Sequence, residues 1–118
     1  MFGMTEIDAN TLARRLEEDS DGLRLLDIRS PQEMAQGMIP GGEPLPMHLI
    51  PLREQDLIAS DRPTVLYCRS GARSAQACMY LISRGAAPER IINLRGGIID
   101  WARAGLPVVA PAADPAIA

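Results

Sequence analysis

The stretch VLYCRSGARSAQA, residues 65–77, combines a β-like apolar run, a polar glycine loop and the beginning of a helix. The apolar run ends in Cys68, and the loop that follows carries Arg69 and Arg73. The helix begins directly after the loop, so its unpaired N–H groups point back toward the cysteine. The fold must therefore place a thiol where a strand ends and a helix begins.

Apolar runs of the same kind occur on both sides of this stretch. They are short, rich in aliphatic residues and bounded by turn residues, as buried strands are. We place strands at residues 23–28, 64–68 and 90–94. Residues 39–46 form a loop in this interpretation, with one brief extended segment.

Helical patterns separate these strands. Asp8 is a suitable N-cap for the first helix, and SPQE at residues 30–33 is the sequence pattern of a capping box. In chain order, helices are predicted at about residues 9–18, 31–37, 49–59, 73–84 and 96–105. The helix at 73–84 is expected to bury one apolar face, made of Ala75, Cys78, Met79 and Ile82.

Strands and helices therefore alternate along the chain. Alternation predicts an α/β fold, with a central, mostly parallel sheet and helices on both faces. Functional groups in such folds lie at the carboxyl ends of the strands. Residues 27–29, Cys68 and residues 95–97 each lie at the carboxyl end of a predicted strand, so we expect them to converge at one edge of the sheet.

The length of 118 residues suits a single domain, which we place at residues 1–110. The remaining residues, 111–118, are small residues and prolines, and we expect a flexible C-terminal tail there. Nearly half of the chain, 47%, is apolar, so a core can form without disulfides or metals.

The charge pattern argues against several classes of partner. The chain has 12 basic and 15 acidic residues and a net charge of -3, which does not suit a nucleic-acid or anionic-membrane binder. Every basic residue is an arginine, so Schiff-base and other lysine chemistry is excluded. No apolar run has the length of a membrane span, and the N-terminus lacks the pattern of a secretory signal.

Only two cysteines and one histidine are present, which does not support a disulfide framework or a Cys/His zinc site. We therefore expect a cytoplasmic protein with no metal and no organic cofactor.

The environment of Cys68 favours a thiolate. The helix N-terminus, a nest of loop N–H groups around Gly71, and the charges of Arg69 and Arg73 all stabilise an anionic sulfur. This pattern favours a nucleophilic Cys68 over a cysteine that only fills space. Cys78, on the predicted apolar face of its helix, is expected to be structural.

Three functions use such a loop: sulfur transfer, phosphoryl or arsenate chemistry, and non-enzymatic sulfur carriage or docking. Phosphatases of the Cys-x5-Arg type have five residues between cysteine and arginine, whereas four, residues 69–72, precede Arg73 here. The shorter ring favours a single sulfur atom over a phosphoryl group. A sulfur carrier remains an open alternative, because it would also hold the sulfur on Cys68 as a persulfide.

The sequence resembles the single-domain rhodanese, or thiosulfate sulfurtransferase, family. YCRSGARSA resembles the family's active-site loop, and LLDIRSPQE, GMIPGG and NLRGGIIDWARAGLPV resemble its other blocks, in the same order over about residues 5–109. The block GMIPGG departs from the family's usual pattern, because Met38 replaces a histidine.

The resemblance implies roles for individual residues. Cys68 would accept a sulfane sulfur and become a persulfide. The loop would bind the sulfur and an anionic donor, through Arg69, Ser70, Gly71, Ala72, Arg73 and Ser74. Supporting roles would fall to Asp27 and Arg29, as a structural pair, and to Arg95, at the rim. The expected partners are small sulfur-containing anions and small sulfur-carrier proteins, and neither nucleic acid nor membrane.

Overall fold

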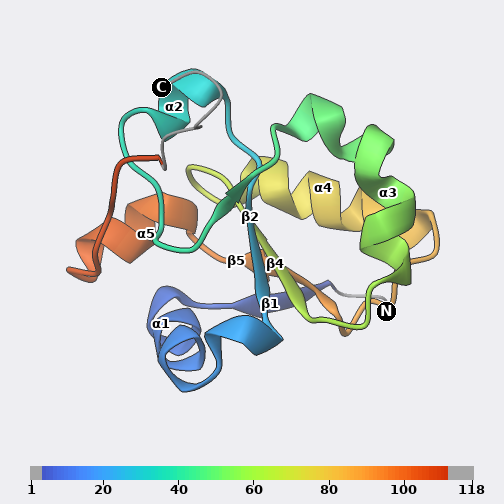
Figure 1. Cartoon of the computed structure of the whole chain (residues 1–118), viewed down its shortest axis with the longest axis horizontal. Coiled ribbons are helices and arrows are strands. Elements are labelled where there is room, and N and C mark those ends of the chain that lie inside the picture. Colours follow the sequence, from blue (N-terminus) through green and yellow to red (C-terminus); the bar gives the residue numbers. More distant parts are fainter. Residues whose placement is uncertain (1–3, 112–118) are drawn as a thin grey trace.

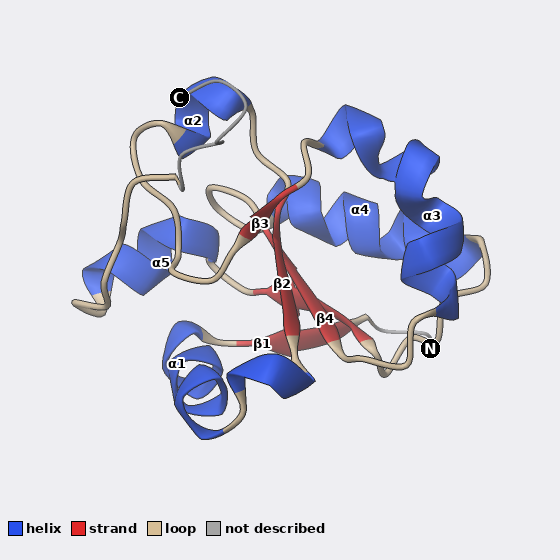
Figure 2. Cartoon of the chain, in the orientation of Figure 1, coloured by secondary structure: helices blue, strands red, loops and turns tan. Residues whose placement is uncertain are grey.

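The computed structural model of the protein describes residues 4–111. A five-stranded sheet lies at the centre of the molecule (Figures 1 and 2). All neighbouring strands in it are parallel. In the order in which they lie side by side, the strands are β1 (Thr5–Ile7), β5 (Ile91–Leu94), β4 (Thr64–Tyr67), β2 (Arg24–Asp27) and β3 (Glu43–Pro44). The three predicted strands are confirmed as the centre of the sheet. The edge strand β1 was not predicted, because three residues are too few to show a period.

Helices cover both faces of the sheet, as predicted (Figure 2). The helices are α1 (Ala9–Glu18), α2 (Pro31–Met34), α3 (Ile50–Ala59), α4 (Ala72–Ser83) and α5 (Gly97–Arg103). Short 3-10 turns lie at Ser20–Gly22 and Met47–Leu49. α1 and α5 pack on one face, and α3 and α4 on the other. The fold is therefore α/β.

Local capping explains where two of these helices begin. The Asp8 carboxylate accepts a hydrogen bond from the Thr11 N–H at 2.8 Å and so caps α1. Ser30 and Glu33 form the predicted capping box at the start of α2, with Pro31 in its first turn. These caps satisfy N–H groups that a helix leaves without partners.

The predicted buried face of α4 is wrong by one residue. The residues that α4 buries are Ser74, Ala77, Cys78 and Leu81, whereas the side chain of Met79 is half exposed. The spacing is the predicted one, but the helix is rotated so that Ser74 faces the sheet. Hydropathy does not favour burying a serine, and hydrogen bonds in the site described below are what make this rotation favourable.

Two apolar clusters, one on each face of the sheet, form the core. No helix in the described part of the chain combines the length and apolar character that crossing a bilayer requires. The expected tail at 111–118 lies outside the described residues except for Pro111, and the division at residue 110 stays a prediction.

Candidate active site

Cys68 follows β4 directly and lies at the carboxyl edge of the sheet, where the loop 69–71 leads into α4. It is 1% exposed. Gly71 precedes the first residue of α4 with a φ of 102°, a left-handed conformation that favours glycine. A Cβ at this position would also lie 3.2 Å from the backbone nitrogen of Gly96. The loop therefore closes around Cys68 in a shape that needs glycine.

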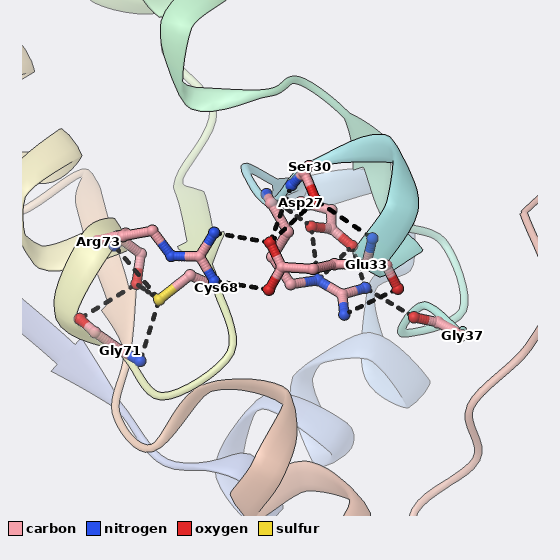
Figure 3. A network of polar contacts seen from close by, with 9 residues as sticks. Asp27, Ser30, Glu33, Gly37, Cys68, Gly71 and Arg73 are labelled. Carbon is pink, nitrogen blue, oxygen red and sulfur yellow. Dashed lines mark hydrogen bonds and ion pairs between the residues drawn. The ribbon is translucent and has the colours of Figure 1, made fainter. Parts of the chain in front are cut away.

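Hydrogen-bond donors surround the Cys68 sulfur (Figure 3). The Gly71 N–H lies 3.1 Å from Sγ, the Ser74 N–H 3.5 Å, and the Ser74 hydroxyl oxygen 3.4 Å. The Ser74 N–H belongs to the first turn of α4 and the Gly71 N–H to its N-cap residue, where N–H groups lack helical partners. The predicted nest is confirmed for Gly71 and Ser74.

These donors change the acidity of the thiol. Burial alone would raise the pKa of Cys68, but hydrogen bonds from the Ser74 hydroxyl and from the N–H groups of Ser74, Gly71 and Ser70 outweigh burial, so the pKa lies below its ordinary value. Cys78 is fully buried, and burial raises its pKa to about 12. Only Cys68 of the two thiols is therefore prepared for ionisation.

The start of α5 turns the loop's carbonyl groups away from the sulfur. The Ile98 N–H donates to the Cys68 carbonyl at 3.0 Å, and the Ile99 N–H donates to the Arg69 carbonyl at 3.1 Å. Gly97 permits this close approach, because a Cβ there would lie 2.5 Å from the Cys68 carbonyl oxygen. With those acceptors occupied by α5, the sulfur is surrounded by donors rather than by carbonyl oxygens.

Arg73 does not offer a free positive charge to the site, and this corrects the expectation from the sequence. Its guanidinium forms two hydrogen bonds with the Glu33 carboxylate, at 2.8 and 2.7 Å (Figure 3). This pairing lowers the pKa of Glu33 to about 2. Arg73 and Glu33 therefore largely neutralise each other beside the thiol, and the role of Arg73 in substrate binding stays a prediction.

Two cavities adjoin this ion pair. One, of about 430 Å³, is lined by Glu33, Arg29 and the exposed Arg69. The other, of about 550 Å³, is lined by Arg73 and His48 among others. Cys68 itself lines neither cavity.

Asp27 and Arg29 form the buried structural pair that the sequence predicts. Arg29 Nη2 lies 2.7 Å from Asp27 Oδ2, and the same nitrogen donates to the Gly37 carbonyl at 2.6 Å. Arg29 Nη1 also donates to the Glu33 carbonyl at 3.4 Å. The pair thus fixes α2, which carries Glu33, against the end of β2.

The expected place of Arg95 at the rim of the site stays a prediction. Its side chain is 63% exposed and lies 3.8 Å from Asp8. Met38 is buried, and its backbone pairs with Val109. Among residues 4–111, no three His, Cys, Asp or Glu side chains gather as a metal site would require.

Two residues of the site were missed in the sequence. Glu33 was assigned only to a helix cap, although its carboxylate also binds Arg73. Asn93, which is 2% exposed and contacts Ser74, was not singled out. The available signal was a polar residue inside the otherwise apolar strand IINL.

The chain matches the family model of the rhodanese-like domain over residues 8–104. It is 58% identical over 108 residues to a sulfurtransferase of Allochromatium vinosum, covering 92% of this chain and 97% of that protein. It is 31% identical over 100 residues to the thiosulfate sulfurtransferase GlpE of Pseudomonas entomophila, covering 83% and 87% of the two chains. A crystal structure of a rhodanese-like domain protein from Staphylococcus aureus has a TM-score of 0.77 at 27% identity, covering 92% of this chain and 100% of that one.

Proposed function

Because the chain belongs to the rhodanese-like domain family and is a sulfurtransferase, we propose that it transfers sulfane sulfur through a persulfide on Cys68. The observation that carries this proposal is the ring of donors around one sulfur atom. Such a ring stabilises a thiolate before the reaction and a negatively charged sulfur after it. Within the described residues 4–111, the second cysteine, Cys78, receives no such hydrogen bonds, and burial raises its pKa.

The reaction has two halves. In the first, the Cys68 thiolate attacks the outer sulfur of a donor; a bond from Sγ to that sulfur forms, the bond between the sulfur and the rest of the donor breaks, and the leaving group takes the electron pair. In the second, a nucleophilic acceptor attacks the outer sulfur and Sγ leaves as a thiolate. Loop donors stabilise Sγ in the thiolate, so they assist both attack and departure.

The donor is a sulfane-sulfur compound: thiosulfate, a polysulfide or a protein persulfide. The relative GlpE is a thiosulfate sulfurtransferase, which supports thiosulfate as one candidate. Within residues 4–111, no carboxylate forms an ion pair with Arg69, so Arg69 is the loop's free cation toward an anionic donor. We therefore propose small sulfur anions and sulfur-carrier proteins as the partners of this reaction.

Mass spectrometry tests the persulfide directly. Incubation with a sulfane donor should add about 32 Da, the mass of one sulfur atom, to the peptide that contains Cys68. Reduction should remove the added mass. The Cys78 peptide should stay unlabelled, because its thiol is buried and weakly acidic. A label on Cys78 alone would contradict the assignment.

Replacing Glu33 should change how the site uses anionic donors. Glu33→Gln keeps a residue that suits the capping box, but it releases the charge of Arg73. We expect kcat/KM for thiosulfate to rise about 3- to 10-fold at low salt and the gain to shrink as salt is added. Steady-state kinetics with thiosulfate and with a neutral organic trisulfide measure the effect.

Two controls make this experiment specific. The neutral trisulfide should show no comparable gain, because it does not respond to the charge of Arg73. Glu54→Gln removes a carboxylate that pairs with Arg84 on the α3–α4 side, and it should leave both donors unaffected. An equal gain for the charged and neutral donors would show that Glu33 does not act through charge.

A further inference from the structure

The hydroxyl of Ser74 has more acceptors than it can serve. It is fully buried and carries one proton. Its oxygen lies 2.5 Å from Asn93 Oδ1, 3.3 Å from the Gly71 carbonyl oxygen and 3.4 Å from Cys68 Sγ. The shortest of these contacts is the one to Asn93. A hydrogen bond to Asn93 and a hydrogen bond to Cys68 are therefore alternatives.

The direction of the Asn93 amide follows from its other partners. Its Nδ2 lies 3.0 Å from Glu6 Oε2 and 3.3 Å from the Gly71 carbonyl oxygen. A carboxylate and a carbonyl only accept hydrogen bonds, so the NH₂ group must face them. The amide oxygen is then directed at Ser74 and can only accept. Glu6 is held beside Asn93 because the two residues are register partners in β1 and β5.

We propose that Asn93 is a positioning residue for the sulfur-transfer reaction. Its amide oxygen competes with Cys68 Sγ for the single hydrogen bond that the Ser74 hydroxyl can donate. When Sγ is a thiolate, the hydroxyl donates to sulfur. When Sγ is neutral, the hydroxyl donates to the amide oxygen of Asn93. This inference rests on the proposed role of Cys68.

The reaction supplies a reason for a second acceptor. Sγ is anionic before it attacks the donor, but in the persulfide the charge lies on the outer sulfur and Sγ is neutral. A buried hydroxyl left at that stage with only the longer, 3.3 Å contact to the Gly71 carbonyl would be poorly paired and would destabilise the intermediate. Asn93 Oδ1 accepts the hydrogen bond of the Ser74 hydroxyl in that half of the cycle, so the hydroxyl keeps a close partner throughout. The consequence is that the Cys68 thiolate receives a weaker hydrogen bond from the Ser74 hydroxyl than it would without Asn93.

Charged groups surround the thiol on several elements. They are Glu6 from β1, the Asp27–Arg29 pair at the end of β2, Glu33 from α2, Arg69 in the loop and Arg73 from α4. Replacing Asn93 or Ser74 by an apolar residue removes none of these charges, but replacing Asn93 also removes the hydrogen bond that its Nδ2 donates to Glu6. That loss is the same whether residue 74 is Ser or Ala, so a shift in thiol acidity that depends on Ser74 reports the hydroxyl rather than net charge.

The test is a cycle of two substitutions read by thiol titration. The absorbance of the thiolate near 240 nm is measured against pH. The same titration of Cys68→Ser is subtracted, which removes the absorbance of all other groups. Asn93→Leu, of similar size, should lower the pKa of Cys68 by about 0.5 to 1 unit, because the hydroxyl is then free to donate to sulfur. In the Ser74→Ala background, Asn93→Leu should shift it by less than about 0.2 unit.

Each outcome of the cycle is informative. An equal shift in both backgrounds, or no shift in either, would overturn the competition. Asn93→Val removes the same acceptor in a residue that suits a strand, and it replaces Asn93→Leu if circular dichroism shows that Leu is not accommodated. Because the titration needs no sulfur donor, a failure of this proposal is distinguishable from a failure of the persulfide mechanism.

Discussion

Cys68→Ser is expected to reduce sulfur transfer by at least about 10³-fold, the size of effect seen when a covalent nucleophile is removed. Serine is close in size to cysteine, so the fold and the ring of loop donors should persist. Its hydroxyl ionises far too weakly to attack a sulfane sulfur at neutral pH, and it cannot form a persulfide. Steady-state turnover with thiosulfate or a polysulfide, together with the mass of the treated protein, measures both consequences.

The second cysteine provides the matched control. Cys78 is buried on α4, and burial raises its pKa to about 12. Cys78→Ala should therefore leave turnover within about twofold of the parent, since it removes packing atoms but none of the groups that donate to Cys68 Sγ. Substantial transfer by Cys68→Ser that is lost in Cys78→Ala would reverse the assignment of the two thiols.

The position of the thiol could be predicted because it is encoded locally. Strand, loop and helix follow one another within residues 65–77, and a cysteine in that order must lie at a helix N-terminus. The capping box of α2 is equally local, and both predictions are confirmed. Short-range spacing is sufficient wherever the interacting groups are neighbours in the chain.

The partners of the loop could not be predicted in the same way. Glu33 lies 40 positions before Arg73, and Asn93 lies 19 positions after Ser74. These contacts depend on the order of the strands and on the rotation of α4 about its axis. Hydropathy alone predicted that rotation wrongly. The result is that the sequence predicts two free arginines, whereas the structure pairs one of them with a carboxylate.

The buried pair of Asp27 and Arg29 carries the second large effect, this time on stability. Arg29→Met keeps most of the side-chain volume but leaves the Asp27 carboxylate, which is fully buried, without its cation. Removing one partner of a buried ion pair costs about 3 to 5 kcal/mol of folding free energy. Urea unfolding should show a much lower midpoint with an unchanged m-value.

Two further variants separate the possible causes of that loss. Asp27→Leu/Arg29→Met removes both charges and should recover a large part of the lost stability, because no unpaired charge stays buried. Arg24→Met removes an arginine whose carboxylate partners, Asp56 at 3.5 Å and Glu43 at 3.7 Å, are exposed, so it should cost far less. If Arg29→Met cost no more than Arg24→Met, burial of the pair would not control its contribution. The attachment of α2 through the Gly37 carbonyl would then have to depend on other contacts, and with it the position of Glu33 beside Arg73.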